Sequence, residues 1–409
     1  MACTPTGSMT LLTASDTKVR LLFVSHCFPP KDAPMSKIGG MQRVGIDLLK
    51  QLEAHPDVDV ETVILRSQRE NEYLGFVPFL YRAFTTARAK MKQGEIDVVL
   101  FSAMPSAVLT AVLARTSRET SVPLAAISHG HDVIADSSAY QWLVARVFSR
   151  LDAMLPVSRA TGQQCVQRGL PPDRLFVTPN GIEPDRFGET FPGLYSARAD
   201  RRKVLADAFP ELAGLIGPGD LLLCSVGRQV KRKGHEWFIR TVMPQLGENV
   251  HLALGGKGPE SDGIRQATVD TGMQSRVHCL GLVAEEKLAS LYSGGDLFIM
   301  PNIPIAGDME GFGVVMLEAG LCGMPSIASR IEGIQDVITN GVNGYCVNPL
   351  DAGGFAEAIN CYAAAPDSLA NLSQSTRSHT VDTFAWPGVC GQIVATLKKV
   401  IDRKKAPAN

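Results

Sequence analysis

The stretch Pro301-Asn-Ile-Pro-Ile-Ala-Gly-Asp-Met-Glu310-Gly-Phe-Gly313-Val-Val-Met-Leu-Glu318-Ala-Gly-Leu-Cys-Gly-Met-Pro325 carries most of the information in this chain. Residues 295–300, just before it, are mostly apolar and predict a short buried strand. After a polar loop, the residues from Gly311 to about Gly323 predict an apolar helix. A strand, a glycine-rich turn and a helix N-terminus form a natural anion site, because the first amides of a helix are unpaired and its dipole favours negative charge.

Two carboxylates bracket this turn. Glu310 precedes it, and Glu318 lies about two helical turns further on. A carboxylate beside a phosphate site is electrostatically unfavourable unless it binds something else. Carboxylates accept hydrogen bonds well, so contacts with the hydroxyls of a sugar or a ribose would explain both residues.

Length and composition limit the protein classes. A chain of 409 residues is too long for one ordinary core, so we expect two domains. The net charge of -1 gives no reason to expect a nucleic-acid partner. The first eighteen residues lack a long apolar run, and we expect a disordered tail without a signal peptide. No uncharged apolar run is long enough to span a bilayer.

The nine cysteines are scattered and form no C-x-x-C pair. Several of them lie in or beside apolar runs, namely Cys27, Cys224, Cys279, Cys322 and Cys346. This pattern predicts reduced, buried cysteines of a cytoplasmic protein rather than a disulfide or zinc framework.

Strand and helix patterns alternate along the chain in two series. The first series has expected strands at residues 19–25, 58–65, 96–101, 123–127, 153–158 and 175–179, and the second at residues 221–226, 251–255, 277–282, 295–300, 325–329 and 344–347. Such alternation predicts an α/β protein with two doubly wound parallel sheets facing across a cleft. We expect one domain at residues 19–182, a second at 183–380, and a C-terminal helix at 381–409 that packs back on the first.

Residues 73–92 combine aromatic and basic side chains on a predicted helix. An amphipathic helix of this composition is typical of a peripheral membrane contact or of a cradle for a lipid-linked molecule. The alternative is a surface helix whose aromatic residues belong to the core.

Arg228 and Lys233 share one glycine-flanked loop after the strand at 221–226. A diphosphate needs fixed positive charge, which arginine supplies as a fork and lysine as a point charge. The alternative is a solvated charged loop, because Lys231 and Arg232 lie there too. At the other end of the chain, Gly39-Gly40 follow a strand and open a helix, either as a second anion contact or as a turn that needs positive φ.

The segment His129-Gly130-His131-Asp132 follows a strand, at the edge of an α/β sheet where ligands bind. No partner at ligand spacing indicates a metal, so His129 is the better candidate for a substrate contact. A dinucleotide fingerprint, a G-x-x-x-x-G-K-[ST] loop and a G-x-S-x-G elbow are all absent from the sequence.

Taken together, these motifs resemble the retaining glycosyltransferases of family 4, which have the GT-B architecture of two facing Rossmann-like domains. The resemblance covers nearly the whole chain from about residue 19. It rests on five segments in the family's order: Gly39-Gly40, Pro179-Asn180-Gly181-Ile182, Gly227-Arg228-x4-Lys233-Gly234, Gly256-x-Gly258-Pro259, and Glu310-x7-Glu318 with Glu-Gly-Phe-Gly and Leu-Glu-Ala.

The resemblance implies a set of roles. Glu318 would bind the ribose of a UDP- or GDP-sugar, and Glu310 would contact the sugar near the reacting carbon. Arg228 and Lys233 would hold the diphosphate, and His129 would contact the sugar and stabilise the transition state. The remaining donor contacts would come from Gly39, Gly40, Gly256, Gly281, Leu282, Phe312, Gly313 and Val314.

The reaction implied is transfer to a hydroxyl of a glycan or lipid-linked glycan in cell-envelope or polysaccharide biosynthesis, with no cofactor and no metal. Two alternatives stay open on the residues alone: a sugar-nucleotide epimerase or phosphorylase on the same fold, and a non-catalytic binding protein. One departure from the family pattern is the longer segment at residues 304–308 before Glu310, which we expect to shape the donor-sugar pocket.

Overall fold

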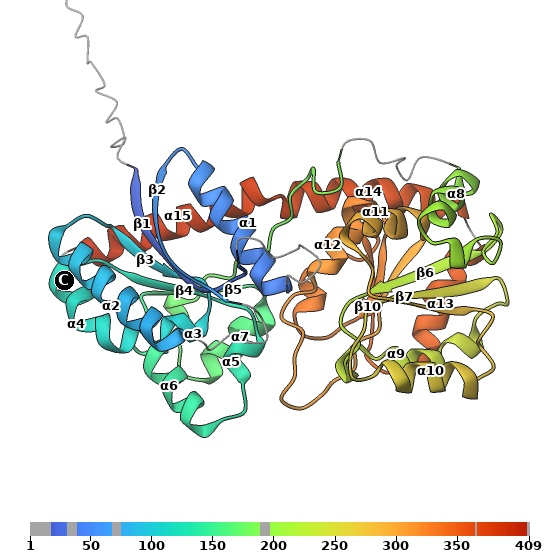
Figure 1. The fold of residues 1–409 in the computed structure, drawn as a ribbon, viewed down its shortest axis with the longest axis horizontal. Helices are drawn as coiled ribbons and strands as arrows, with labels where there is room; N and C mark the ends of the chain where they lie inside the picture. The colour runs from blue at the N-terminus through green and yellow to red at the C-terminus, as the bar shows by residue number, and fades with distance from the viewer. Residues whose placement is uncertain (1–17, 31–38, 68–74, 189–196, 365, 407–409) are drawn as a thin grey trace, which may run out of the picture.

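The computed structural model describes residues 18–30, 39–67, 75–188, 197–364 and 366–406. Two parallel sheets lie side by side, each between layers of helices (Figure 1). The strands of the first sheet are β1 Val19–Phe28, β2 Val58–Arg66, β3 Val98–Phe101, β4 Leu124–Ser128 and β5 Ala153–Pro156. Those of the second are β6 Leu221–Val226, β7 Val250–Gly255, β8 Val277–Gly281, β9 Leu297–Met300, β10 Ser326–Ser329 and β11 Gly344–Val347.

Helices connect the strands in both halves. Around the first sheet lie α1 Gly40–Ala54, α2 Phe76–Gln93, α3 Met104–Ala107, α4 Thr110–Thr120, α5 His131–Ile134, α6 Ser138–Phe148, α7 Arg159–Gln167 and the 3-10 turn η3 Pro172–Arg174. Around the second lie α8 Arg198–Ala208, α9 His235–Thr241, α10 Ser261–Asp270, α11 Glu285–Gly294, α12 Val314–Leu321 and α13 Ala352–Ala364, with the 3-10 turns η4 Pro210–Leu212, η5 Lys231–Lys233, η6 Met243–Gln245 and η7 Glu332–Asp336. The chain ends in α14 Pro366–Phe384 and α15 Trp386–Lys405.

Strand order places a switch point in each sheet. The first sheet runs β2-β1-β3-β4-β5 and the second β11-β10-β9-β6-β7-β8, the two common doubly wound orders. Ligands of such sheets bind outside the carboxyl ends of the strands where the order reverses. In the second sheet that point lies between β6 and β9, so the loop with Arg228 and Lys233 and the loop with Glu310 flank it.

Alternate side chains of each strand enter different cores. In β1, Leu21 and Phe23 face the side of α1 and α15, whereas Leu22 and Val24 face the side of α2 and α4. Both faces are apolar because helices cover both, as is typical of parallel sheets.

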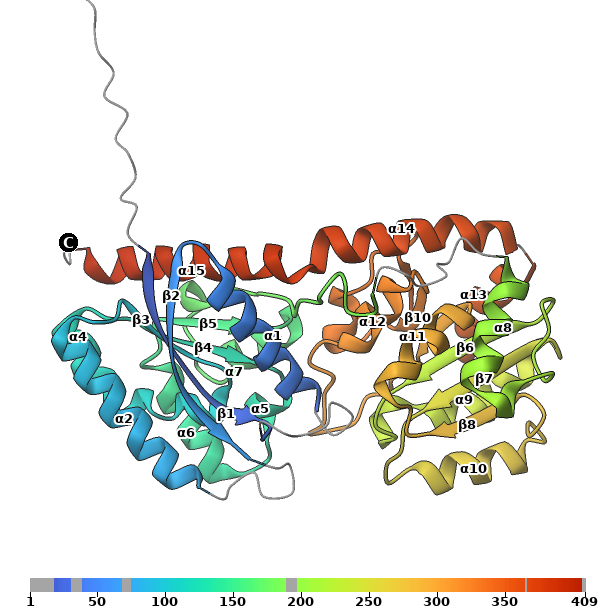
Figure 2. The same ribbon diagram turned by 45° about the horizontal axis from the view of Figure 1, so that its top comes forward.

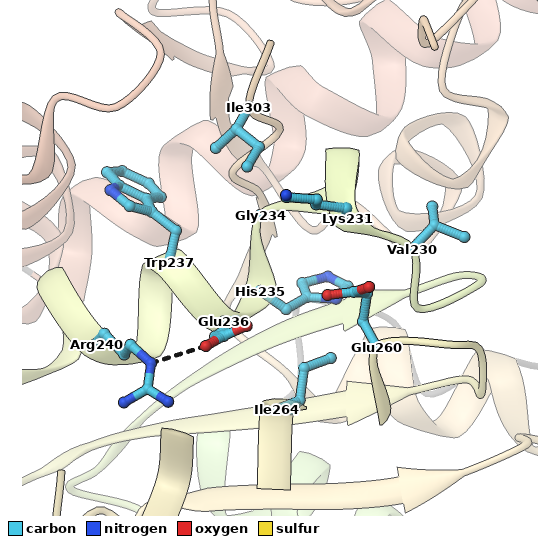
Figure 3. A pocket seen from close by; sticks show the side chains of 10 residues that line it. All are labelled: Val230, Lys231, Gly234, His235, Glu236, Trp237, Arg240, Glu260, Ile264 and Ile303. Carbon is cyan, nitrogen blue, oxygen red and sulfur yellow. Dashed lines mark hydrogen bonds and ion pairs between the residues drawn. The ribbon is translucent and has the colours of Figure 1, made fainter. Parts of the chain in front are cut away.

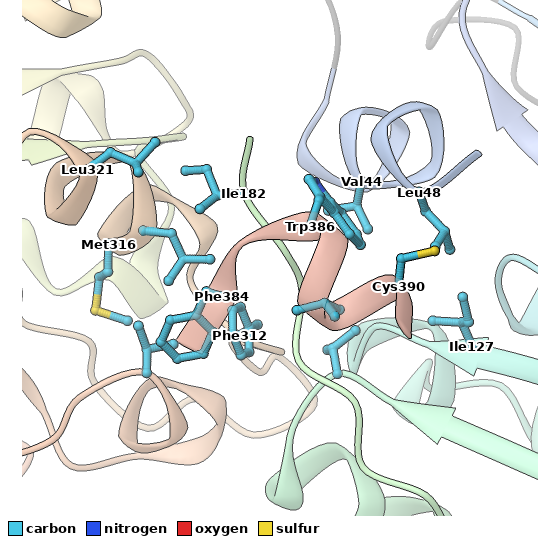
Figure 4. Packing of buried hydrophobic residues seen from close by; sticks show 14 of the residues in the cluster. Val44, Leu48, Ile127, Ile182, Phe312, Met316, Leu321, Phe384, Trp386 and Cys390 are labelled. Carbon is cyan, nitrogen blue, oxygen red and sulfur yellow. The ribbon is translucent and has the colours of Figure 1, made fainter. Parts of the chain in front are cut away.

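One hydrophobic core is continuous through the two halves. Ile182, on the first crossover, pairs with residues 384–386 on the return: Ile182 N donates to Phe384 O (2.8 Å), and Trp386 N donates to Ile182 O (3.0 Å). The Trp386 ring leaves no room for a side chain at Gly181, where a Cβ would lie 2.3 Å from it. Figure 4 shows Phe384 near Phe312 on one side of this crossing and Trp386 near Val44 on the other.

Helix α15 returns to the first half of the molecule. α14 and α15 run along one side of both sheets (Figure 2). Lys398 Nζ pairs with Asp57 (2.7 Å) and Lys404 Nζ with Asp152 (2.7 Å), while Val389 and Ile393 are buried. The C-terminal helix thus contacts the first half of the molecule within residues 386–405.

The structure differs from the predictions in two local features. Residues 175–179 form no strand and make only an isolated bridge from Leu175 to Met154, since β5 is an edge strand with an extended segment beside it. Of the cysteines predicted to be buried, Cys279 is exposed and Cys346 is half-buried, because β8 and β11 are the edge strands of the second sheet. Within the described residues, no helix has both the length and the apolar character needed to cross a membrane.

Candidate functional site

The two halves touch at the carboxyl ends of their sheets. Gly130, after β4, has a φ of +102°, and a Cβ there would lie 2.9 Å from Gly311 Cα. In the reverse direction, a Cβ on Gly311 would lie 1.9 Å from His129 O. Only glycines allow this approach, so the loop of the opening stretch and the His129 loop form opposite walls of one site.

Glu310 lies at the centre of a charged cluster on the second half. Its Oε2 accepts from Lys233 Nζ at 2.7 Å, from Asn302 Nδ2 at 3.3 Å and from Arg232 Nη1. Its backbone N donates to Glu332 Oε2 at 2.5 Å. All of these partners come from the loops that follow β6 and β9 and from η7, so their arrangement does not depend on the first half of the molecule.

Burial and charge act in opposite directions on this cluster. Burial would raise the pKa of the Glu310 carboxyl, but Lys233 and Arg232 outweigh it and hold the pKa below its usual value. Burial lowers the pKa of Lys233, and Glu310 offsets part of that effect. Burial raises the pKa of Glu332. The site therefore holds an ionised Glu310 against two cations.

Arg228, the predicted partner of Lys233, is exposed, and its guanidinium has no hydrogen-bond or ion-pair partner among the described residues. The loop that carries it packs tightly on its neighbour: a Cβ at Gly256 would lie 1.9 Å from Gly227 O, and one at Gly258 would lie 2.1 Å from Gln229 O. These glycines bring the loops after β6 and β7 together, while the guanidinium is left available for a ligand.

Helix α12 begins at Val314, slightly later than predicted, with Gly313 as its N-cap at a φ of +93°. The Phe312 side chain is buried in the core, so this residue can offer a ligand only its backbone. The amides of Phe312 and Gly313 have no acceptor among the residues that the structure describes. They are available to an anion at the helix N-terminus.

Glu318 belongs to a different network. Its Oε2 accepts from Tyr292 Oη at 2.9 Å, and its Oε1 lies 2.9 Å from Arg186 Nη2. Arg186 also pairs with Glu285 at 2.8 Å, and Glu285 accepts two bonds from Arg43 at 2.6 and 3.0 Å. A row of four charges thus links Glu318 to α1 on the first half.

The predicted anion contact Gly39-Gly40 lies at the start of α1, and Arg43 follows it in the same helix. Gly39 is the N-cap with a φ of −76°, so the turn does not need positive φ. Its amide donates to Gln42 Oε1 at 3.0 Å, which engages one of the two amides predicted to reach a phosphate. Gly40 has open space around it.

Two of the predicted donor contacts, Gly281 and Leu282, lie at the end of β8 and just after it. Gly281 has a φ of +66°, and its carbonyl accepts from Gly256 N at 2.6 Å. Leu282 is 75% exposed. An apolar side chain with that exposure at a sheet's carboxyl edge presents a surface on which a flat ring can lie.

His129 is half-buried, and its backbone carbonyl lies against Gly311 in the Glu310 loop. Its Nε2 lies 2.9 Å from Ser102 O, and because a carbonyl only accepts, the proton is on Nε2 and Nδ1 is an acceptor in the neutral ring. Asp132 accepts from the backbone N of His129 (2.8 Å) and of Met104 (3.2 Å). His131 is exposed. Asp132 thus orients the loop, and no group of three or more His, Cys, Asp or Glu suited to a metal occurs within the described ranges.

A pocket of about 250 Å³ lies beside η5, the turn that carries Lys231, Arg232 and Lys233. Its walls include Lys231, Gly234, Trp237 and Glu260 (Figure 3). Gly234 packs against Pro301 O, where a Cβ would lie 2.0 Å away. Neither Lys233 nor Glu310 lines this pocket, so it is separate from the charged cluster.

Sequence motifs did not identify the partners that connect the predicted residues. They are Arg43, Arg186, Arg232, Glu285, Tyr292, Asn302, Asp308 and Glu332. Two of them had a local signal: Arg232 lies in the basic run, where nothing set it apart from Lys231, and Asp308 lies in the longer segment at residues 304–308.

Two family models match the chain, one on each half. Residues 38–186 match the model described as Glycosyltransferase Family 4, and residues 220–364 match Glycosyl transferases group 1. Together these matches cover more than half of the chain; the first includes β2 to β5 and the second β6 to β11.

Relatives and solved structures agree with these matches. The chain is 29% identical to a GDP-mannose-dependent alpha-(1-6)-phosphatidylinositol monomannoside mannosyltransferase of Mycolicibacterium smegmatis, over 74% of this chain and 77% of that protein. It is 27% identical to the amylovoran biosynthesis glycosyltransferase AmsK of Erwinia amylovora, over 52% of this chain and 48% of that protein.

The structure of Anabaena HepE in complex with UDP and glucose superposes with a TM-score of 0.67 and 20% identity, over 93% of this chain and all of that one. This likeness concerns the fold. With two doubly wound domains that meet at the carboxyl ends of their sheets and both family models matched, the chain belongs to the GT-B glycosyltransferases, with a family 4 domain followed by a group 1 domain.

Proposed function

We propose that the protein transfers a sugar from a UDP- or GDP-sugar to a hydroxyl of a glycan or lipid-linked glycan, with retention of anomeric configuration and without a metal ion. One observation carries this proposal: the Glu310 carboxyl group lies 2.7 Å from Lys233 Nζ at the switch point of the second sheet, in a loop that packs against the backbone of His129. A carboxylate for sugar hydroxyls and a cation for phosphate occupy the same place.

Lys233 and Arg228 are proposed to hold the diphosphate, together with the amides of Phe312, Gly313 and Val314. As the bond between the sugar and the phosphate breaks, negative charge grows on the phosphate oxygen. Two cations and a helix N-terminus stabilise that charge. The Arg228 guanidinium is exposed and unpaired among the described residues, and so it is available to turn toward a donor.

The proposed chemistry takes place on one face of the sugar. The acceptor oxygen forms its bond to the anomeric carbon as the bond to the diphosphate breaks, and the acceptor proton passes to the departing phosphate oxygen. The sugar passes through an oxocarbenium-like state. Glu310 contacts sugar hydroxyls and favours that positive charge, and His129 contacts the sugar from the facing domain.

The nucleoside is proposed to lie between Glu318, Gly281, Leu282 and Gly256, with Gly40 and Gly39 near the phosphates. Glu318 retains lone pairs for ribose hydroxyls beyond those used by Tyr292 and Arg186. The named relatives support a nucleotide-sugar donor, GDP-mannose for the mycobacterial protein and UDP in the HepE complex. The phosphatidylinositol mannoside in the first name supports a lipid-linked acceptor.

Helix α2 supports a narrower membrane hypothesis than residues 73–92 as a whole. Phe79, Ala83, Ala87 and Met91 are buried, so its main apolar face belongs to the core. A second stripe is exposed and consists of Val77, Tyr81, Arg88 and Lys92. We propose that this stripe contacts anionic lipid. In a co-sedimentation assay, Tyr81→Ser with Arg88→Gln should abolish binding to anionic vesicles, and an absence of wild-type binding would refute the contact.

A donor screen tests the enzymatic proposal. The protein is incubated with UDP-glucose, UDP-galactose, UDP-N-acetylglucosamine or GDP-mannose and a lipid extract, and released UDP or GDP is measured together with the glycosylated product. We expect one donor to give product and nucleotide in equal amounts. Release of nucleotide with free sugar alone, or of an epimerised sugar, would contradict glycosyl transfer.

A further inference from the structure

The segment at residues 304–308, which departs from the family pattern, contacts the charged cluster around Glu310 through Arg232. Arg232 Nε lies 3.0 Å from Asp308 Oδ1, and its Nη1 donates to Glu310 Oε2. The Arg232 guanidinium therefore bridges two carboxylates with different nitrogens of one planar group. Its side chain is 20% exposed, so the bridge is partly shielded from solvent.

The bonds to Glu310 are unevenly distributed. Oε2 has three donors, namely Arg232, Lys233 and Asn302, although a carboxylate oxygen has about two lone-pair positions. Oε1 has no partner among the residues that the structure describes. One donor on Oε2 is thus in excess, and Oε1 is the oxygen left for a substrate hydroxyl.

Lys233 is the donor that lies beside the loop of Arg228. Its ammonium lies against Gly227, where a Cβ would be 4.0 Å from Nζ, beside the loop that carries Arg228. A diphosphate at that loop would attract Lys233 away from Glu310. Arg232 would remain, because Asp308 holds its other edge.

We propose that Arg232, held by Asp308, is the positioning residue that keeps Glu310 charged and fixed when Lys233 turns to the donor diphosphate. The inference rests on the proposed role of Glu310 as the sugar contact. It also gives the 304–308 segment a role, since this segment supplies the carboxylate that fixes the arginine.

The local backbone supports a fixed Asp308. Asp308 N donates to Ile305 O at 3.2 Å, and the two residues form an isolated bridge around Gly307, which has a φ of +75°. Ile303 N donates to Arg232 O at 2.9 Å, and this bond joins the start of the same loop to η5. The arginine and its carboxylate thus belong to one connected piece of backbone.

The test follows the ionisation of Glu310 directly. Glutamate carboxyls are labelled with ¹³C, Glu310→Gln identifies the Glu310 signal by its loss, and the pH titration is recorded with and without UDP or GDP. We expect the wild-type pKa of Glu310 to change little when the nucleotide binds. In Arg232→Gln with nucleotide bound, we expect the pKa to rise by about one unit, because the remaining cation has moved to the phosphate.

Other titratable and charged groups near Glu310 could also change its pKa. They are Lys233 on η5, Asp308 on the same loop, Glu332 on η7 and His129 on the facing domain. Arg232→Lys, which keeps the charge, should restore the wild-type titration. Lys231→Gln, in the same turn but exposed, is the matched control and should leave the titration unchanged. Asp308→Asn should raise the pKa less than Arg232→Gln does.

A Glu310 pKa that is the same in Arg232→Gln and wild type, with nucleotide bound, would overturn the inference. Thermal unfolding of Arg232→Gln and Arg232→Lys shows whether each variant is folded when it is titrated. The proposed function fails separately: full transfer activity in Glu310→Gln would remove Glu310 from the reaction whatever its titration. Loss of transfer in that variant with an unchanged titration in Arg232→Gln would overturn the role of Arg232 alone.

Discussion

Glu310 and Glu318 are eight positions apart in the sequence, yet their surroundings differ in kind. The partners of Glu310 all belong to the second half of the molecule, chiefly Lys233 and Arg232. Glu318 is connected through Arg186 and Glu285 to Arg43 of the first half. The difference teaches that the proposed sugar contact is formed within one domain, whereas the proposed ribose contact depends on how the two domains meet.

This contrast separates two kinds of substitution. Changes around Glu310 should affect the chemical step whatever the distance between the domains. Changes along the row from Arg43 to Glu318 should affect donor binding and closure.

The largest effect is expected from Lys233→Met. The variant loses the buried cation proposed to stabilise the leaving diphosphate, and kcat/KM should fall about 10²–10³-fold. Release of UDP or GDP under steady-state conditions measures this. Lys231→Met, two positions away and exposed, should retain nearly full activity. Equal losses in the two variants would show that only the net charge of the loop matters.

A smaller effect with a different signature is expected from Glu318→Gln. The ribose is remote from the reacting carbon, so the donor KM should rise about 10-fold or more while kcat changes less. Tyr292→Phe, which removes one hydrogen bond to the same carboxylate, should produce a milder version of this pattern. If Glu318→Gln lowered kcat at an unchanged KM, the ribose assignment would be wrong.

The ion pair between the domains should show coupling. Arg43→Gln and Glu285→Gln should each raise the donor KM several-fold, and the double variant should be no worse than either one. The expected coupling energy is about 1 kcal/mol for a partly buried bidentate pair. Arg159 and Asp336 form another ion pair between the two domains, but the Arg159 side chain is 72% exposed. Arg159→Gln should therefore have little effect on the donor KM. Strictly additive losses would mean that Arg43 and Glu285 act independently.

The smallest expected effect concerns pH. Burial would raise the pKa of Glu285, but Arg43 and Arg186 hold it below its usual value. A carboxyl whose pKa is depressed in the closed form stabilises that form above the ordinary glutamate pKa of about 4.3 and stops doing so as pH falls through the depressed value.

Small-angle scattering of wild type and Glu285→Gln checks this. The difference in their radii of gyration should be constant well above the ordinary glutamate pKa of about 4.3 and disappear as the pH falls through the depressed pKa of Glu285. A difference that persists unchanged at lower pH would show that domain closure does not depend on the charge of Glu285.

The sequence was a good guide wherever the signal is local. Alternating apolar strands and glycine turns predicted both sheets, and the loops after β6 and β9 lie at the switch point because strand order brings them there. The aromatic residues of α2 were ambiguous, since periodicity alone does not show which of two apolar stripes faces the core.

Long-range pairs could not be predicted. Arg43 and Glu285 are 242 positions apart, and only the folded arrangement of two domains brings them together. The basic run from Arg228 to Lys233 has four cations with similar local surroundings. Which of them reaches Glu310 depends on the direction of η5, and the structure selects Lys233 and Arg232 rather than Arg228.

The anomeric configuration of the product tests the central claim most directly. With the donor identified by the screen, the coupling between the anomeric proton and its neighbour, or the one-bond carbon–proton coupling for a manno sugar, is read by NMR at early reaction times. The account predicts that the product keeps the anomeric configuration of the sugar in the donor. An inverted product would contradict same-face transfer at the Glu310–Lys233 site.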